Sequence, residues 1–207
     1  MLSKRLGWGL IVVSMLMLLG CGATKNTLSK DKDILASNHD GYLLMSVDTQ
    51  TDLSSIRVFG RTTFTLSKDD LRKGSNYILL ALPAGDYRFT KITIGRSYYM
   101  LRDEIWDFSI KPQVISYVGD LSFVSAFGGA NISLVNQSSM ALEFLEDSFP
   151  NILAQRAVEY QGPGEDSFFD YAASVEQGVV APPASATPVT PMPEKQGAVQ
   201  TARGEAQ

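Results

Sequence analysis

The sequence contains one cysteine, Cys21, and one histidine, His39, among its 207 residues. A single cysteine excludes any disulfide within the chain, even in an oxidising compartment. Zinc sites of the usual cysteine and histidine type are excluded too, because too few of these residues are available. A Ser-His-Asp or Cys-His catalytic arrangement would have to use His39, which lies in a polar stretch. We therefore interpret His39 as a surface residue and expect no catalytic residues, no metal site and no cofactor.

The chain also lacks an apolar stretch long enough for a permanent membrane-spanning helix. The apolar run Leu6–Leu19 has 14 residues, whereas a helix needs roughly 20 residues to cross a bilayer. Lys4 and Arg5 precede this run, and the small residue Gly20 follows it. This order of basic, apolar and small residues predicts a secretory signal peptide over residues 1–20.

The segment Leu18-Leu19-Gly20-Cys21 resembles the lipobox of bacterial lipoprotein precursors. The resemblance implies signal-peptidase cleavage between Gly20 and Cys21 and lipidation of the Cys21 thiol, where two or more acyl chains would anchor the protein stably. Gram-negative lipoproteins that stay in the inner membrane usually have Asp after this cysteine, and here the residue is Gly22. We therefore expect the lipidated protein to lie on the outer membrane, facing the periplasm. The alternative is an ordinary secreted protein whose only cysteine lies at this point by chance.

Charge and composition divide the mature chain into three parts. Loss of residues 1–20 removes Lys4 and Arg5 and changes the formal charge from −4 to −6, so the chain as a whole does not attract nucleic acid or anionic lipid. Composition predicts a lipidated tether over 21–40, a folded domain over 41–161 and a largely disordered tail over 162–207. Five prolines lie in this tail: Pro182, Pro183, Pro188, Pro191 and Pro193.

Short runs rich in β-branched and aromatic residues fill most of the predicted domain and predict strands. Their spacing indicates a mainly β fold, an antiparallel β-sandwich with one or two short helices at its C-terminal end. The predicted strands are Tyr42–Val47, Ser55–Phe59, Thr62–Leu66, Tyr77–Leu82, Tyr87–Ile94, Tyr98–Leu101, Trp106–Ile110, Val114–Val124 and Asn131–Val135.

Local features refine this prediction. The sequence Leu82-Pro83-Ala84-Gly85-Asp86-Tyr87 predicts a tight, hairpin-like reversal, and a shift of the apolar phase predicts a β-bulge near Thr90-Lys91. Ser139 is a candidate cap for a helix that buries Ala141, Leu142 and Leu145. Ser148 and Pro150 are expected to open a second helix that runs through Val158. These helices are expected to cover an edge or a face of the sandwich.

Three segments together resemble an uncharacterised family of bacterial envelope lipoproteins, a domain of unknown function related to transthyretin-like and carboxypeptidase-regulatory-like β-sandwiches. The segments are Leu82–Tyr87, Phe108–Pro112 and Ile115–Leu121, and the similarity covers about Tyr42 to Gln161. The family often has Gly in the turn before the third segment, where this chain has Pro112-Gln113. The resemblance implies the fold and the compartment but no catalytic residues, because fold alone does not define function.

Two kinds of side chain remain as candidates for a site. Acidic residues occur in three clusters, Asp69-Asp70, Asp103-Glu104-Asp107 and Glu143-Glu146-Asp147, which we interpret as solvated surface because none has the spacing of a calcium-binding loop. Four aromatic residues on neighbouring strands are expected either to fill the core or to form a stacking surface for a glycan or a protein. These are Tyr98, Tyr99, Trp106 and Tyr117.

These observations favour a membrane-anchored, non-enzymatic β-sandwich that binds another component of the cell envelope, protein or glycan. The alternative is an envelope hydrolase or metal-dependent enzyme that uses the clustered carboxylates. A purely structural lipoprotein is the third possibility.

Overall fold

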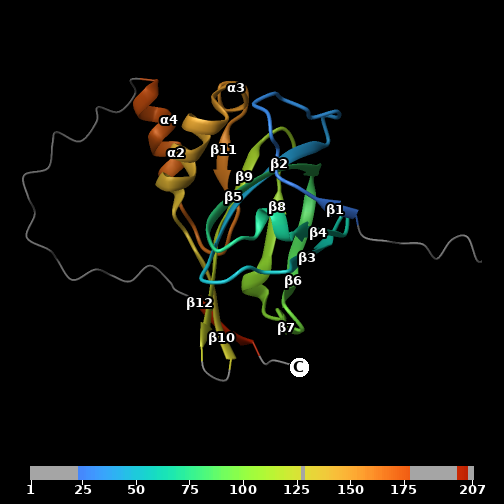
Figure 1. The fold of residues 1–207 in the computed structure, drawn as a ribbon. Helices are drawn as coiled ribbons and strands as arrows, with labels where there is room; N and C mark the ends of the chain where they lie inside the picture. Colours follow the sequence, from blue (N-terminus) through green and yellow to red (C-terminus); the bar gives the residue numbers. More distant parts are fainter. Residues whose placement is uncertain (1–22, 127–128, 178–199, 205–207) are drawn as a thin grey trace, which may run out of the picture.

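The computed structural model describes residues 23–126, 129–177 and 200–204. Within these residues two six-stranded sheets pack face to face, and helices cover the outer face of the second sheet (Figure 1). The prediction of a mainly β sandwich with short C-terminal helices is confirmed. None of the helices in this part of the chain has the length and apolar character needed to span a membrane.

The first sheet, sheet A, is antiparallel except at one edge. Its strand order is β1-β4-β3-β6-β7, with β8 paired to the first half of β6, and only β1 and β4 run parallel. The strands are β1 (Ala23–Lys25), β3 (Ser55–Gly60), β4 (Phe64–Ser67), β6 (Gly85–Ile94), β7 (Ser97–Met100) and β8 (Asp107–Ile110).

The second sheet, sheet B, is mixed. Its order is β12-β10-β9-β2-β5, and its central pair, β2 and β9, runs parallel, as does β11 beside β9. The expectation of purely antiparallel sheets is therefore corrected. The strands are β2 (Asp40–Thr49), β5 (Gly74–Pro83), β9 (Ile115–Ala126), β10 (Gly129–Val135), β11 (Val158–Tyr160) and β12 (Gln200–Gly204).

Sheet B has a hydrophobic core on each of its faces. Leu43, Met45 and Val47 point from β2 into the core between the sheets. Tyr42 and Leu44 point the other way, into a second core beneath the helices. Since strand side chains alternate between faces, a strand buried on both sides needs a continuous apolar run, which β2 has.

The helices build the second core from predicted apolar positions. Helix α2 (Ser138–Ser148) buries Ala141 and Leu145, as expected, although Gln137 rather than Ser139 lies at its N-cap. Helix α3 (Pro150–Leu153) begins with Pro150 and is shorter than predicted, so Val158 lies in β11. Two 3-10 turns connect strands: η2 (Lys68–Asp70) joins β4 of sheet A to β5 of sheet B, and η3 (Glu104–Trp106) joins β7 to β8 within sheet A.

The two local predictions have different outcomes. Strands β5 and β6 are joined by a tight turn as predicted, where Gly85 has a φ of +141°, a conformation that suits glycine. The prediction of a hairpin-like reversal is wrong, because β5 pairs in sheet B and β6 in sheet A. The pairing of β3 with β6 shifts at Thr90, because Arg57 lies opposite Lys91 while Val58 lies opposite Phe89. This shift is the predicted bulge.

The segment predicted as a tether packs on the domain from Ala23 onward. Strand β1 pairs with β4, and the Leu28 amide then donates to the carbonyl of Leu79 on β5. Asp31 accepts hydrogen bonds from the backbone amides of Asn151 and Ile152, and so caps helix α3 from more than a hundred residues away. Residues 23–39 are therefore part of the fold, contrary to the expectation of a flexible tether.

Asp33 fixes the end of this N-terminal segment. Its carboxylate accepts hydrogen bonds from the Tyr42 hydroxyl at 2.8 Å and from Nε of Arg156 at 2.9 Å. Burial opposes ionisation, but the bonds from Arg156 and Tyr42 hold the pKa of Asp33 below its usual value. The ionised carboxylate therefore stabilises the fold at neutral pH, and this contribution is lost as the pH falls towards the lowered pKa.

The predicted disordered tail also contains structure. Phe168–Glu176 form helix α4, which buries Phe169 against the second core, and β12 pairs antiparallel with β10. The stretch 162–175, which lies in the predicted tail but which composition alone did not assign as disordered, is thus folded or in contact with the domain. Residues 178–199 and 205–207, which include the five prolines, lie outside the described residues.

We predict that Asp33→Ala lowers the free energy of unfolding by about 2–3 kcal/mol at pH 7, because Arg156 and the Tyr42 hydroxyl lose a largely buried acceptor. Urea unfolding followed by circular dichroism measures the change. Asp69→Ala is the matched control, since its pair with Arg72 spans 3.8 Å and is exposed, and we expect a change within about 0.5 kcal/mol. Equal effects of the two substitutions would contradict the role of Asp33.

Candidate functional site

The four aromatic residues considered as a stacking surface do not come together. Tyr99 and Trp106 are buried in the core between the sheets, whereas Tyr117 is buried in the core beneath the helices. Only Tyr98 is partly exposed, on β7, with the Lys91 ammonium 5.4 Å from its ring centroid. The interpretation of these four residues as a shared stacking surface is therefore wrong, because three of the rings fill the cores.

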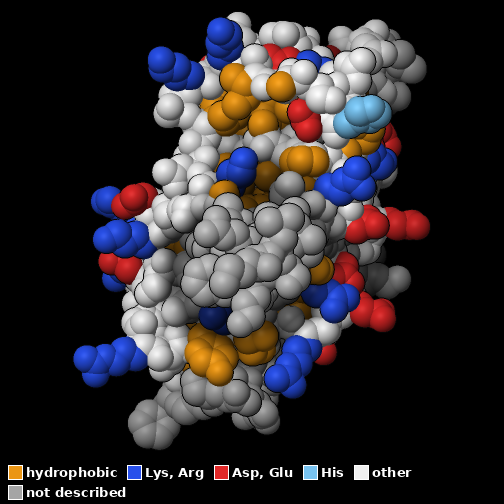
Figure 2. Space-filling view, turned by 90° about the vertical axis from the view of Figure 1, so that its right-hand side faces the viewer, with side chains coloured by type: hydrophobic (Ala, Val, Ile, Leu, Met, Phe, Trp, Pro, Cys, Tyr) orange, Lys and Arg blue, Asp and Glu red, His pale blue; other side chains and the backbone are white. Residues whose placement is uncertain are grey.

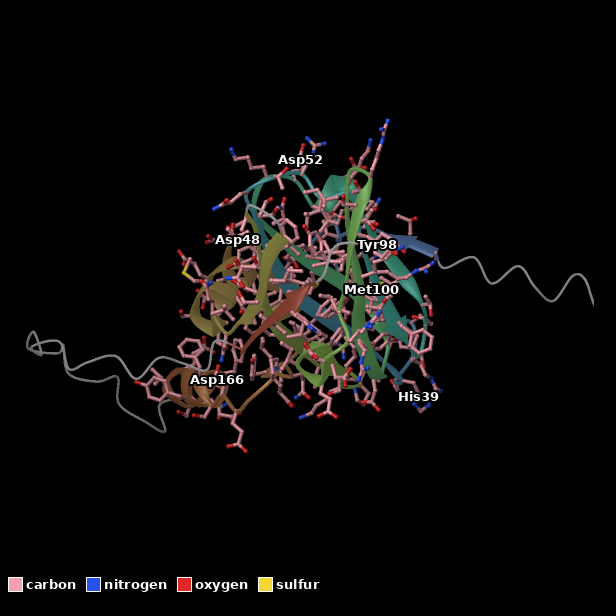
Figure 3. The ribbon with its side chains drawn as sticks, turned by 90° about the horizontal axis from the view of Figure 1, so that it is seen from below. His39, Asp48, Asp52, Tyr98, Met100 and Asp166 are labelled. Carbon is pink, nitrogen blue, oxygen red and sulfur yellow. The ribbon has the colours of Figure 1, made fainter. Side chains whose placement is uncertain are left out.

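The other predicted candidates are dispersed. His39 lies exposed just before β2, at the lower right of Figure 3, as expected of a surface residue. Asp70 accepts from the Thr27 amide, and Asp107 pairs with Arg88. Across residues 23–126, 129–177 and 200–204, no three His, Cys, Asp or Glu side chains gather in a way that could hold a metal ion. Gly20 and Cys21 lie outside the described residues.

A cleft of about 790 Å³ opens where sheet A meets the segment that follows β11. Phe59 from β3, Arg88 from β6 and Asp107 from β8 lie side by side on the outer face of sheet A, because these residues are directly opposite in the strand registers. Residues 160–164 form the facing wall. A volume of this size lies within the range of small-molecule and oligomer sites.

Glycines allow the walls of this cleft to approach the sheets closely. A Cβ on Gly162 would lie 2.5 Å from the Val118 carbonyl oxygen, and one on Gly60 would lie 2.4 Å from that of Asp86. Tyr160 secures the same wall, because its hydroxyl donates to the Pro163 carbonyl at 2.8 Å. Larger side chains at either glycine would displace the cleft wall or β3.

The polar groups of the cleft are fixed by one another. Arg88 pairs with Asp107 through two hydrogen bonds, and the Ser109 hydroxyl donates to the Gln161 amide oxygen at 2.8 Å. Phe59 stands beside them with 63% of its surface exposed, the most of any large hydrophobic side chain in the described residues. The cleft thus offers one exposed ring and an ordered set of donors and acceptors.

A second unusual feature is a buried carboxyl group on the helix-covered face of sheet B. Gly119, with a φ of +106°, forms a bulge in β9, where the register with β2 shifts between Leu44 and Ser46. The bulge brings Asp120 onto the same face as Tyr117, whose hydroxyl donates to Asp120 at 2.8 Å. The backbone N–H of Gln137 donates to the same hydroxyl at 3.0 Å.

Burial changes the acidity of both members of this pair. Burial raises the pKa of Asp120 to about 6, with a further contribution from the nearby charge of Asp48, although the Tyr117 hydrogen bond lowers it. Burial and the Asp120 charge likewise raise the pKa of Tyr117. Ionisation of Asp120 therefore destabilises the domain as the pH rises, whereas Tyr117 stays protonated. Both groups are enclosed beside helix α2 and do not face the cleft.

The chain matches no model of a protein family, no curated protein and no solved structure. The resemblance to envelope lipoproteins therefore stays a prediction. The cleft is the feature that the sequence did not indicate, because its residues come from β3, β6, β8 and the segment after β11.

We predict that Asp120→Asn raises the free energy of unfolding at pH 8 by on the order of 2–3 kcal/mol and has little effect near pH 4. The folded-state pKa lies above the unfolded one, so the wild type is most stable relative to the variant at low pH and loses that stability as the pH rises through about 6. Urea unfolding at several pH values measures the difference.

Asp103→Asn is the control for this prediction, because Asp103 is exposed and makes no side-chain cap bond. Its effect on the free energy of unfolding is expected to stay within about 0.5 kcal/mol across the same pH range. A difference between wild type and Asp120→Asn that is constant from pH 4 to pH 8 would show that Asp120 titrates normally.

Proposed function

We propose that this protein is a membrane-anchored bacterial lipoprotein whose β-sandwich binds another component of the cell envelope in the cleft beside β8. The observation that carries the binding role is the cleft itself, where the exposed Phe59 ring stands beside the Arg88–Asp107 pair. The lipobox-like segment ending at Cys21 supports the anchor. Gly22 favours the outer membrane, facing the periplasm.

The arrangement of the cleft residues favours binding over catalysis. Within the described residues the Ser109 hydroxyl donates to an amide oxygen and contacts no basic side chain, and Asp107 is neutralised by Arg88. Nucleophilic catalysis needs a base that can remove the proton from such a hydroxyl. Fixed polar groups beside an exposed ring instead suit recognition, since their geometry is set before the ligand arrives.

The cleft suits an extended ligand, a glycan or a protein segment. An aromatic face can stack on the apolar face of a sugar or on an apolar side chain. Arg88, Asp107 and Gln161 then supply directional hydrogen bonds to hydroxyl, amide or carboxylate groups.

The lipid anchor predicts that Cys21→Ser abolishes incorporation of an alkyne-labelled fatty acid in cells and moves the protein out of the membrane fraction. The physical reason is that the hydroxyl of serine does not replace the thiol that accepts the lipid. In-gel detection of the label and membrane fractionation measure the two effects. A Ser3→Ala variant serves as the control, because it lies in the same predicted signal peptide away from the cysteine. Label that persists in Cys21→Ser would contradict the anchor.

The binding role predicts specific photo-crosslinks from the cleft. A photoreactive phenylalanine analogue placed at Phe59 in intact cells is expected to form a discrete adduct with a protein or a glycan, identified by mass spectrometry. The same analogue at Tyr171 is the control, since this residue is also exposed but lies on α4, away from the cleft. Arg88→Ala is expected to reduce the adduct at least several-fold. Identical adducts at both positions, or none at Phe59, would contradict the proposal.

A further inference from the structure

The predicted anchor is joined to the domain almost without slack. Only Gly22 separates Cys21 from Ala23, the first residue of β1. Two residue steps span at most about 7 Å between Cα atoms. Ala23 is itself held in register opposite Phe64 on β4. The lipid attachment point therefore cannot lie far from the β1 edge of sheet A.

The chain stays bound to the domain after β1. The Thr27 amide lies 3.3 Å from an Asp70 carboxylate oxygen, and the Leu79 amide donates to the Thr27 hydroxyl at 3.0 Å. Asp31 and Asp33 then attach the same segment to helix α3 and to Arg156. The segment from Ala23 to Asp33 is thus fixed along its length, so it cannot act as a spacer.

The sheet edge beside this attachment point has an unusual composition. We define the acid-free edge as residues 23–25 and 55–67, which comprise β1, β3, β4 and the loop between β3 and β4. It contains Lys25, Arg57 and Arg61 but no Asp or Glu, although the mature chain carries a formal charge of −6. Asp69 and Asp70 follow this edge closely in the chain, so the edge is a basic strip bordered by acidic residues.

The acid-free edge presents a polar row to solvent. Thr24, Thr65 and Arg57 lie directly opposite one another on β1, β4 and β3. Their neighbours Val58, Phe64 and Leu66 point into the core, so this row faces outward. Figure 2 looks onto this side of the molecule, where Lys and Arg side chains lie towards both its upper and lower ends and Asp and Glu side chains lie along its flanks.

We infer that the acid-free edge of sheet A docks on the phospholipid bilayer that holds the Cys21 lipid. This inference rests on the proposed lipid anchor and adds a fixed orientation to it. The short connection brings β1 to the level of the lipid headgroups, and the exposed Arg57 and Arg61 pair there with phosphate groups. An edge that carried carboxylates would be repelled from the same surface.

The docked orientation also sets the distance of the cleft from the membrane surface. Strands β1 and β8 are separated by four strand spacings in sheet A, which amounts to about 19 Å. Phe59 lies nearer, on β3. The cleft therefore opens close to the membrane surface rather than at the end of a flexible arm, and it meets ligands that lie on or near the bilayer.

Fluorescence quenching by brominated lipid tests the docking. The full acylated protein carrying Thr65→Trp is placed in vesicles of phosphatidylethanolamine and phosphatidylglycerol that are brominated near the headgroup. Tryptophan suits a strand position, and the Thr65 side chain makes no hydrogen bond to another described residue. Trp106 gives a constant background, because it is fully buried in the core. We expect loss of most of the added T65W emission.

Tyr171→Trp is the matched control, because it places an exposed ring on α4, on the far side of sheet B from sheet A (Figure 1). Its added emission is expected to be unchanged by the brominated lipid. The double variant Arg57→Glu, Arg61→Glu is expected to restore most of the T65W emission. Equal quenching of T65W and Y171W, or quenching of neither, would overturn the docking.

Mass spectrometry of the same samples separates the two levels of the proposal. A protein without acyl chains on Cys21 would overturn the lipid anchor and the docking together. An acylated protein whose T65W emission is not quenched would overturn the docking alone. A long Gly-Ser insertion between Gly22 and Ala23 is expected to keep acylation and abolish quenching. Unchanged quenching in the insertion variant would overturn the role of the short connection.

Discussion

The parallel pairing of β2 with β9 is the interaction on which the rest of the structure depends. Both strands are buried on both faces, between sheet A on one side and the helices on the other. Every other strand of sheet B is added to this pair, directly or through β10. A shift of β2 by one residue would exchange its two apolar faces and would disrupt both cores together.

The strands, the β5–β6 turn and the bulge at Thr90 could be predicted because they depend on neighbouring residues. The β2–β9 pairing could not, because it joins segments about 70 residues apart and no local pattern records it. One signal was present in the sequence: the run Tyr42-Leu43-Leu44-Met45 does not alternate, which is typical of a strand covered on both faces. Composition also misassigned residues 23–39, because Asp31 and Asp33 look like solvated charge until their partners are known.

The candidate site was less predictable than the fold. The four aromatic residues lie on runs that are neighbours in sequence, but the sheet order sends them to different cores and faces. The cleft depends on the β6–β8 register and on the wall after β11, both of which are long-range. Gly119 could have drawn attention to Asp120, since a glycine inside a strand often marks a bulge. Net charge alone likewise concealed the basic, acid-free edge.

The contact between Asp31 and the start of α3 has a consequence for the order of events in folding. It joins positions 120 residues apart, so the N-terminal segment cannot be secured until almost the entire domain has left the ribosome. Contacts of this separation slow folding. Under the proposed secretion of this protein, such a delay would leave the chain unfolded for longer. The contact that fixes the folded domain would then also lengthen the time in which the proposed precursor can be threaded through a channel.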